Sequence, residues 1–375
     1  MNIIKPKYEI LEQKYNKESL LIDMFKHIEI CGRTCYKSED KITDESYKKF
    51  VKMLEDANHG AMLEHGTVYL TIPIGTPVDD PQYMWKMDIV RFFQNNKYSK
   101  VNSKTVHEEV DVEIKGYGMK TQASAHFYYI TTNWRVIFEN KDFAVMKYIF
   151  EDFKTTKENL HDSVLEWMTE PTEDHEKRYT VRFTYHLAVA RDINRHRVQS
   201  VGEESTRYCN YAKEKFGGEL NIIEPIFITD SEKDIIHNDN EHLSFVDMCD
   251  MIKKGTDDPT FEAIDYWIFA NKACEYAYMK LTKDFNWTPQ QASLILPLDT
   301  KTCSVHTAFA SDWCHFFNLR ALGTTGSPRP SAKEVAWPLM EEFIKRGYIS
   351  RENINEERYI EIVNKYPNIQ DYIKK

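Results

Sequence analysis

The sequence predicts a mixed α/β fold in which a central mixed sheet is flanked by helices. Two patterns indicate this class. From Leu20 to Ile30 the apolar residues recur at helical spacing, whereas in "TVYLTIPI" Val68, Leu70 and Ile72 alternate with other residues, as in a strand with one buried face. The chain has 375 residues, of which 42% are hydrophobic, so it can bury a full core.

Helices and strands alternate in the first half of the chain. Residues 43–60 repeat the helical pattern, with Thr43 or Asp44 available to cap its start and Gly60 following its end. From Gly75 to about Val112 the sequence is mostly polar, with "GTPVDDPQ" as a turn cluster and "QNNKYSKVNSK" as a loop. A strand-like block, "HFYYITTNWRVIFEN" at 126–140, leads into a helical run from Asp142 to Met168.

The second half begins with a strand at Tyr179 that passes into a helix near Leu187. The charged residues 231–260 are weakly periodic, and we interpret them as peripheral. A long helix is expected over 261–285, with an apolar stripe that Asn271 interrupts and that comprises Ile264, Trp267, Ile268, Cys274 and Tyr278. A loop at 286–302, a helix at 307–322, a Gly/Pro-rich connection at 323–331 and a helix at 332–346 follow.

Composition excludes several classes of function. The chain has 49 basic and 59 acidic residues, a net charge of −10, which argues against broad nucleic-acid binding. No window resembles a signal peptide or approaches 18 uninterrupted apolar residues, so we expect a cytoplasmic protein without a membrane partner. Seven cysteines without a Cys-x-x-Cys pair indicate reduced thiols, and the spacing of Cys and His residues predicts no metal site.

One segment concentrates charged groups in this acidic chain: "INRHRVQSVGEESTRYCNY", residues 193–211. Arg195 and Arg197 flank His196, and Ser205 follows after seven residues. Two guanidiniums offer forked donors for phosphate, carboxylate or an electron-rich heterocycle, and Glu203 can orient a ribose hydroxyl or one of these arginines. The alternative is a solvated helix end whose charges neutralise one another.

This arrangement, "RHR", seven residues and "S", continuing to "RY", resembles the signature of the flavin-dependent thymidylate synthases. Three further stretches match that family: "HGAMLEH" at 59–65 resembles its His-x-Ser-x-x-Glu-His segment, "QQASLILP" at 290–297 its Ala-Arg-x-x-Leu-Pro segment, and "WCHFFNLR" at 313–320 its helix ending in Leu-Arg. The resemblance implies the fold of that family and a single elaborated catalytic domain over 1–375, in which 75–178 is an insertion relative to a minimal member.

The resemblance also implies an activity. It is the C5 methylation of a pyrimidine deoxynucleotide, dUMP to dTMP, with 5,10-methylenetetrahydrofolate as carbon donor and NADPH as reductant. FAD and the nucleotide would bind in sites shared between the subunits of a homotetramer. Because the flavin supplies the chemistry, no cysteine nucleophile is expected, and the protein places and polarises the reactants.

Matching the motifs residue by residue implies a set of site residues. FAD would be held by Arg195, His196, Arg197 and Glu203, with His315 near it and His59 close to both flavin and folate. Substrate contacts would come from Asp192, Ser205, Arg207, Ser293 and Arg320, of which Ser205 and Arg207 face the phosphate. Arg320 and Ser205 are the catalytic candidates, because Arg320 would contact the pyrimidine and stabilise negative charge as C5 becomes nucleophilic. The structural alternative for Arg320 is a cation at a helix C-terminus.

Several positions depart from the family pattern. Ser293 stands where a phosphate-binding arginine is usual, and Asp192 where a glutamine is usual; Ala61, Gly202 and His315 also differ. An ionised aspartate only accepts hydrogen bonds, so it suits cytosine N4 better than uracil O4. A related dCMP methyltransferase or hydroxymethyltransferase, and a flavin- or nucleotide-binding protein without turnover, are therefore alternatives. Trp134 and Arg135 could stack on a planar ligand, although an aromatic strand is more often core.

Overall fold

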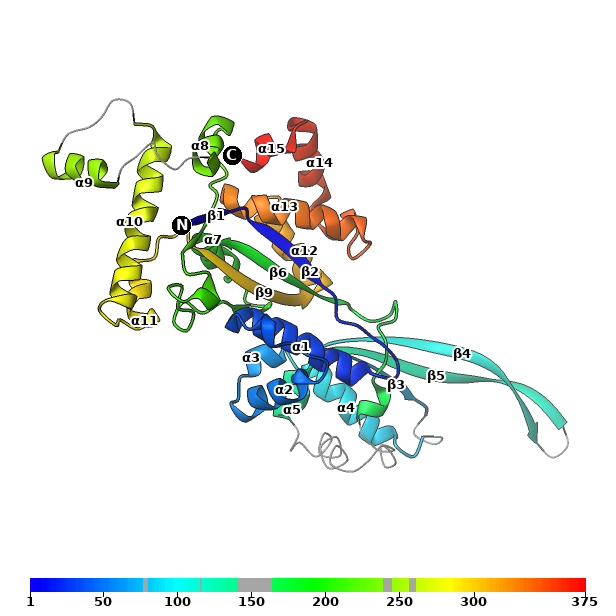
Figure 1. Cartoon of the computed structure of the whole chain (residues 1–375). Helices are drawn as coiled ribbons and strands as arrows, with labels where there is room; N and C mark the ends of the chain where they lie inside the picture. The colour runs from blue at the N-terminus through cyan, green and yellow to red at the C-terminus, as the bar shows by residue number, and fades with distance from the viewer. Residues whose placement is uncertain (77–79, 115–116, 141–163, 239–244, 256–260) are drawn as a thin grey trace.

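A computed structural model describes residues 1–76, 80–114, 117–140, 164–238, 245–255 and 261–375 (Figure 1). It confirms the mixed α/β class. Strands form a four-stranded sheet with the order β2-β6-β9-β7, a three-stranded sheet with the order β3-β5-β4, and a parallel pair, β1 with β8. In the described part of the chain, no helix combines the length and the apolar character needed to cross a membrane.

The four-stranded sheet consists of β2 (Lys7–Leu11), β6 (Arg178–His186), β9 (Lys301–Phe309) and β7 (Ser200–Glu203), and its pairing is antiparallel throughout. One face is apolar. Val181 and Phe183 pack there in a core with α12 (Ala310–Arg320) and α13 (Pro330–Lys345), which lie over this sheet in Figure 1. Burying this face is a large favourable contribution to folding.

The opposite face of this sheet is polar and nevertheless buried. The hydroxyls of Thr180 and Thr307 lie 2.8 Å apart, His27 Nε2 of α1 (Leu20–Tyr36) lies 3.0 Å from Thr180 Oγ1, and His65 Nδ1 lies 2.7 Å from Thr307 Oγ1. Each of these four side chains therefore has a hydrogen-bond partner, which offsets its loss of hydration, although His65 Nε2 has none in the described part of the chain. These hydrogen bonds connect α1, and the residues just before β3, to the four-stranded sheet.

A second core lies between α1 and the three-stranded sheet, which consists of β3 (Thr67–Ile74), β5 (Tyr117–Asn133) and β4 (Lys100–Ile114). Four further helices contribute side chains to this core: α2 (Ser46–Asp56), α3 (Gly60–Leu63), α4 (Tyr83–Asn95) and α5 (Trp134–Glu139). β3 pairs with β5 only as far as His126, whereas β4 and β5 stay paired as far as Ile114 and Tyr117. The two strands therefore project from the body as a ribbon (Figure 1).

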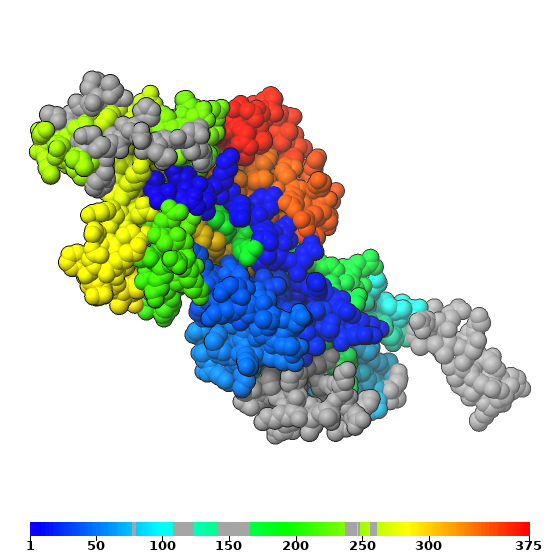
Figure 2. Space-filling model, in the orientation of Figure 1, coloured from blue at the N-terminus to red at the C-terminus, as the bar shows by residue number. Residues whose placement is uncertain are grey.

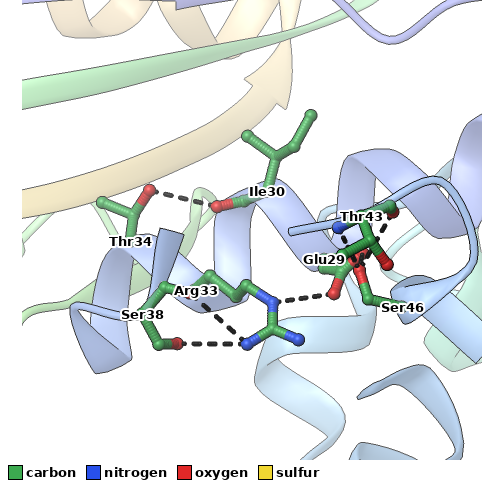
Figure 3. A network of polar contacts seen from close by, with 7 residues as sticks. All are labelled: Glu29, Ile30, Arg33, Thr34, Ser38, Thr43 and Ser46. Atoms are coloured by element: carbon green, nitrogen blue, oxygen red, sulfur yellow. Dashed lines mark hydrogen bonds and ion pairs between the residues drawn. The ribbon is translucent and has the colours of Figure 1, made fainter. Parts of the chain in front are cut away.

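A network at the end of α1 joins it to α2 (Figure 3). Arg33 Nε donates to Glu29 Oε1 at 2.7 Å, and Arg33 Nη1 reaches the carbonyl oxygen of Ser38 at 3.4 Å. Ser46, the first residue of α2, donates to Glu29 Oε2 at 2.9 Å. Glu29 is buried, so these donors replace the water that its carboxylate has lost.

A third cluster surrounds α10 (Ala263–Lys283) and α11 (Pro289–Ala292), which pack on the segment after β7 through Cys209, Tyr211 and Tyr278. Figure 2 shows the yellow surface of α10 beside the green surface of that segment. Further strands and α-helices among the described residues are β1 (Asn2–Ile4), β8 (Asn221–Ile223), α7 (Leu187–Ile193), α8 (Asp230–Asn238), α9 (Phe245–Lys254), α14 (Glu356–Lys365) and α15 (Ile369–Ile373).

The structure corrects four local predictions. α4 and the first residues of β4 replace the polar loops expected between Gly75 and Val112. The strand expected over 126–140 ends at Asn133, and α5 follows. Residues 301–309 form β9, although we expected the end of a loop and the start of a helix. Of the helical run expected from Asp142 to Met168, residues 142–163 lie outside the described residues, and Val164–Trp167 form a short 3-10 turn.

Candidate active site

The arginine-rich segment connects the end of α7 to the edge strand β7. A turn after Ile193 is closed by the His196 amide, which donates to the Ile193 carbonyl at 3.1 Å, and the Gln199 amide donates back to the His196 carbonyl at 3.1 Å. The turn buries His196 and leaves Arg195 and Arg197 exposed. No partner for either guanidinium is present in the described part of the chain, so both are available to a ligand.

His196 is connected to the C-terminus of α12. Arg320 Nε donates to His196 Nε2 at 2.9 Å, and Arg320 Nη2 donates to the Asp192 carbonyl at 2.6 Å. Burial, helped by the nearby Arg320 and His315, lowers the pKa of His196 to about 4. His196 is therefore neutral near pH 7, and it accepts at Nε2, which places its own proton on Nδ1.

Arg320 lies in the last turn of α12, where its positive charge is favourable, and it donates to one carbonyl near the end of α7, that of Asp192. Asp192, on the last turn of α7, also forms an ion pair: Arg329 Nε lies 3.0 Å from Asp192 Oδ2. Arg329 comes from the connection that precedes α13. Sequence reasoning did not single out this arginine, because its partner becomes its neighbour only in the fold.

The two adjacent glutamates have different surroundings. Glu203 accepts from Asn194 Nδ2 at 2.6 Å and from Thr302 Oγ1 at 3.2 Å, and its burial raises its pKa in spite of these bonds. Glu204 points to the other face of the sheet. Lys301 Nζ lies 2.5 Å from Glu204 Oε2 and Lys37 Nζ lies 3.4 Å from Oε1, so Glu204 is a structural anchor of the segment that follows it.

A cavity of about 510 Å³ lies beside the exposed end of β7. His59 and Tyr36 stand on one wall, where a 2.9 Å hydrogen bond joins the Tyr36 hydroxyl to His59 Nδ1. Glu203, Ser205 and Tyr208 line another wall; the other lining residues are Cys35, Asn58, Gly60, Ala61, Met62 and Arg135. Aromatic walls with a few polar groups are typical of sites for planar ligands.

Arg135 was considered in the sequence only for stacking, and the structure places it on this cavity. It reaches Glu64 Oε1 with Nη1 at 2.5 Å and Glu139 Oε1 with Nε at 2.7 Å. A Cβ on Gly60 would lie 2.7 Å from Arg135 Nε, so the glycine provides the space that this guanidinium occupies. A signal was present in the sequence, since "HGAMLEH" carries both Gly60 and Glu64.

Ser205 and Arg207 lie beyond β7 near α11. Arg207 is exposed, and its Nε donates to Gln290 Oε1 at 3.3 Å. Ser293 follows α11 and its hydroxyl donates to the Gln290 carbonyl at 3.0 Å, so Ser293 and Arg207 share a neighbour. His315 is exposed on α12, with its ring centre 6.0 Å from that of His196.

All four matched sequence stretches therefore meet around residues 192–207. The stretch 59–65 supplies the cavity wall opposite Glu203, the stretch 290–297 contacts Arg207, and the stretch 313–320 contacts His196. Two buried polar atoms in this region, Asn194 Oδ1 and Gln199 Nε2, have no hydrogen-bond partner in the described part of the chain. Together with the open guanidiniums of Arg195 and Arg197, these atoms fit a polar, anionic, planar ligand such as a flavin nucleotide.

The solved structures that are similar to this chain include a UMP/dUMP methylase and a thymidylate synthase X. A UMP/dUMP methylase, PolB from Streptomyces cacaoi bound with 5-Br dUMP, is 13% identical with a TM-score of 0.33, covering 92% of this chain and 93% of that chain. Thymidylate synthase X from Helicobacter pylori, with FAD and dUMP, is 13% identical with a TM-score of 0.29, covering 55% of this chain and 83% of that chain. Similarities of this size carry no argument about function.

A search of curated proteins finds no match. The family model for the thymidylate synthase complementing protein, in contrast, matches residues 125–346, more than half of the 375-residue chain. The match includes the arginine-rich segment, α11 and α12, which supply most of the site described above. The chain therefore belongs to the thymidylate synthase complementing protein family, the flavin-dependent thymidylate synthases that its motifs resemble, and is a flavin-dependent methyltransferase.

Proposed function

We propose that this enzyme converts dUMP to dTMP, with FAD as its flavin, 5,10-methylenetetrahydrofolate as carbon donor and NADPH as reductant. The observation that carries the proposal is the convergence of three separated sequence stretches, 59–65, 290–297 and 313–320, on the fourth at residues 192–207. A chance match of motifs would not bring their polar side chains to one place.

The chain's own residues would bind and orient the reactants. Arg195, His196, Arg197 and Glu203 would hold FAD, with His315 and His59 beside it. Ser205 and Arg207 would bind the nucleotide phosphate, while Arg320 would contact the pyrimidine and Asp192 and Ser293 would complete the substrate site. The flavin, when bound, supplies the redox chemistry of the reaction.

The structure gives a reason why no cysteine of the cavity wall would act as nucleophile. Cys35 lines the cavity, but burial raises the pKa of its thiol to about 12. Near pH 7 the group is protonated, and the thiol is a poor nucleophile compared with the thiolate. Catalysis would then depend on placement and electrostatic stabilisation, with Arg320 as the charged donor.

We also propose a homotetramer with shared sites. Around Arg207 and α11, large apolar side chains are open to solvent: Leu294 is 86% exposed, Phe285 69% and Tyr208 69%. Exposed apolar surface beside a polar site is typical of a protein interface. A second subunit covering this surface would also enclose Ser205 and Arg207. Light scattering measures the assembly directly.

Residues 1–375 would form one catalytic domain, with 75–178 as an insertion that contributes residues to the site and a strand to the sheet beside it. Its helix α5 contributes Arg135 to the cavity wall, and its strand β5 joins β3 in the sheet next to the site.

The deciding experiment supplies the purified protein with FAD, NADPH, methylenetetrahydrofolate and dUMP. We expect bleaching of the flavin absorption band by NADPH, its return when folate and nucleotide are added, and dTMP as product. Bleaching without dTMP would contradict the proposal. Mixing Arg207→Ala and Glu203→Ala proteins, at a dUMP concentration too low for either variant to turn over alone, tests the shared sites, because only a site built from two subunits can regain activity.

A further inference from the structure

The ion pair of Asp192 and Arg329 changes what Asp192 can offer to a ligand. Arg329 Nε donates to Asp192 Oδ2 at 3.0 Å, and this is the only hydrogen bond of the Arg329 side chain within the described residues. Its two terminal nitrogens stay open, and half of the side chain is exposed. The pair is electrically neutral, and it presents forked donors toward the surroundings.

Arg329 is held by a stiff backbone. It lies between Pro328 and Pro330, has the extended conformation that a following proline favours, and precedes the first residue of α13. The connection packs tightly on itself, since a Cβ on Gly323 would come within 2.8 Å of Pro328 Cδ and 2.9 Å of the Gly326 carbonyl oxygen. Gly323 also has a φ of +67°, which other residues rarely adopt. Little backbone conformational entropy therefore remains to be lost when Arg329 binds a ligand.

The pair stands directly beside Arg320. Arg320 donates to the Asp192 carbonyl at 2.6 Å, while Arg329 binds the side chain of the same residue. Arg195 also lies close enough to lower the pKa of Arg320, although burial lowers it more. Asp192 is the one carboxylate that contacts these arginines in the described structure, so the local charge is positive.

We propose that Arg329 is a specificity-determining residue, which together with Asp192 selects a pyrimidine with a carbonyl at C4 over one with an amino group there. This inference rests on the proposed function. A lone aspartate would accept from cytosine N4, but Asp192 Oδ2 is engaged and the charge of the carboxylate is balanced. The open guanidinium nitrogens of Arg329 donate, which suits uracil O4 and opposes the amino group of cytosine.

The test compares the affinities of dUMP and dCMP for the FAD-loaded protein by titration calorimetry. Wild-type protein should prefer dUMP. In Arg329→Ala, dUMP loses a charged donor and the freed Asp192 can accept from cytosine, so the dUMP-to-dCMP affinity ratio should fall about tenfold or more. Arg329→Lys keeps one donor and should give an intermediate ratio. Asp192→Asn added to Arg329→Ala should restore part of the preference, because an amide can donate to O4.

Arg346→Ala is the matched control, because Arg346 lies at the other end of α13 and pairs with Glu12 and Glu342. The dUMP-to-dCMP affinity ratio of Arg346→Ala should equal that of the wild-type protein. If Arg329→Ala has the wild-type affinity ratio, or loses affinity for dUMP and dCMP equally, the role of Arg329 is overturned while dUMP remains the substrate. A wild-type protein that prefers dCMP would overturn the proposed function itself.

Discussion

Gly202 illustrates how one residue fixes the geometry of the site. A Cβ at this position would lie 2.6 Å from Cys35 Sγ and 2.6 Å from Met62 Cε. The missing side chain lets the edge strand β7 approach α1 and α3, which carry the opposite wall of the cavity. The departure from the family's asparagine therefore has a local explanation in this chain: there is no space for a side chain.

We predict that Gly202→Ala destabilises the protein by about 1–3 kcal/mol, the usual cost of overpacking. Denaturant unfolding measures it. Cys35→Ala removes the closest sulfur, so the double variant should recover part of the loss. Strictly additive effects of the two substitutions would show that the sulfur is not what limits the approach.

At Arg207 we predict a binding defect without a folding defect. The side chain is exposed and bonds only to Gln290 in the described structure, so Arg207→Ala should unfold like wild type. Loss of a charged donor to the phosphate should raise the KM for dUMP by about tenfold or more. Gln290→Ala is the control for the contact between the two side chains. An unchanged KM in Arg207→Ala would refute the phosphate role.

Among the elements, the junction of α1 and α2 depends on buried charge (Figure 3). We predict that Glu29→Ala costs about 3–5 kcal/mol, because it leaves the buried Arg33 without its carboxylate and Ser46 without its acceptor. Chemical denaturation gives the value. Lys52→Ala, which breaks an ion pair on the exposed face of α2, should leave the unfolding midpoint in place. Equal stability of Glu29→Ala and wild type would contradict this account.

The elements that the sequence predicted are those with an apolar pattern. α1, α2, β3, β6 and α10 lie where the periodicity placed them, since one face of each is buried against apolar neighbours. β9 was missed because its buried side chains include Ser304 and His306, which hydrogen bond to each other at 2.9 Å. No hydropathy pattern marks a strand whose buried groups are polar but satisfied.

For the candidate site, the sequence could identify stretches of the chain but not every side chain that lies among them. The motifs identified the stretches that meet at residues 192–207, because spacing along the chain is a property of the sequence. The ion pairs of Arg135 and Arg329 could not be found in this way, although the sequence did suggest Arg135 as a residue that stacks on a ligand. Each arginine joins the site through an ion pair with a residue more than 70 positions away, and only the folded chain brings those partners together.

Buried histidines make the whole molecule sensitive to acid. Burial lowers the pKa of His27 to about 4 and of His306 to about 3, and burial with nearby Arg320 lowers that of His196 to about 4. They come from α1, β9 and the turn after α7. In each case the unfolded chain binds a proton more readily than the folded one, so the stability they contribute is present above about pH 6.5 and is lost as pH falls toward 4.

Each such histidine should add about 1.4 kcal/mol per pH unit to the slope of unfolding free energy near pH 5. Glu334 opposes this between about pH 4.5 and 7, because burial raises its pKa to about 7 and the folded chain then holds this proton more readily than the unfolded one. We predict that His27→Gln lowers the slope between pH 5 and 6 by about 1 kcal/mol per pH unit. Thr180→Val removes the hydrogen bond to His27 without removing the titrating group. Thr180→Val should lower the free energy of unfolding by a similar amount at every pH, so the slope against pH should stay the same. An unchanged slope in His27→Gln, in contrast, would show that His27 is protonated in the folded protein.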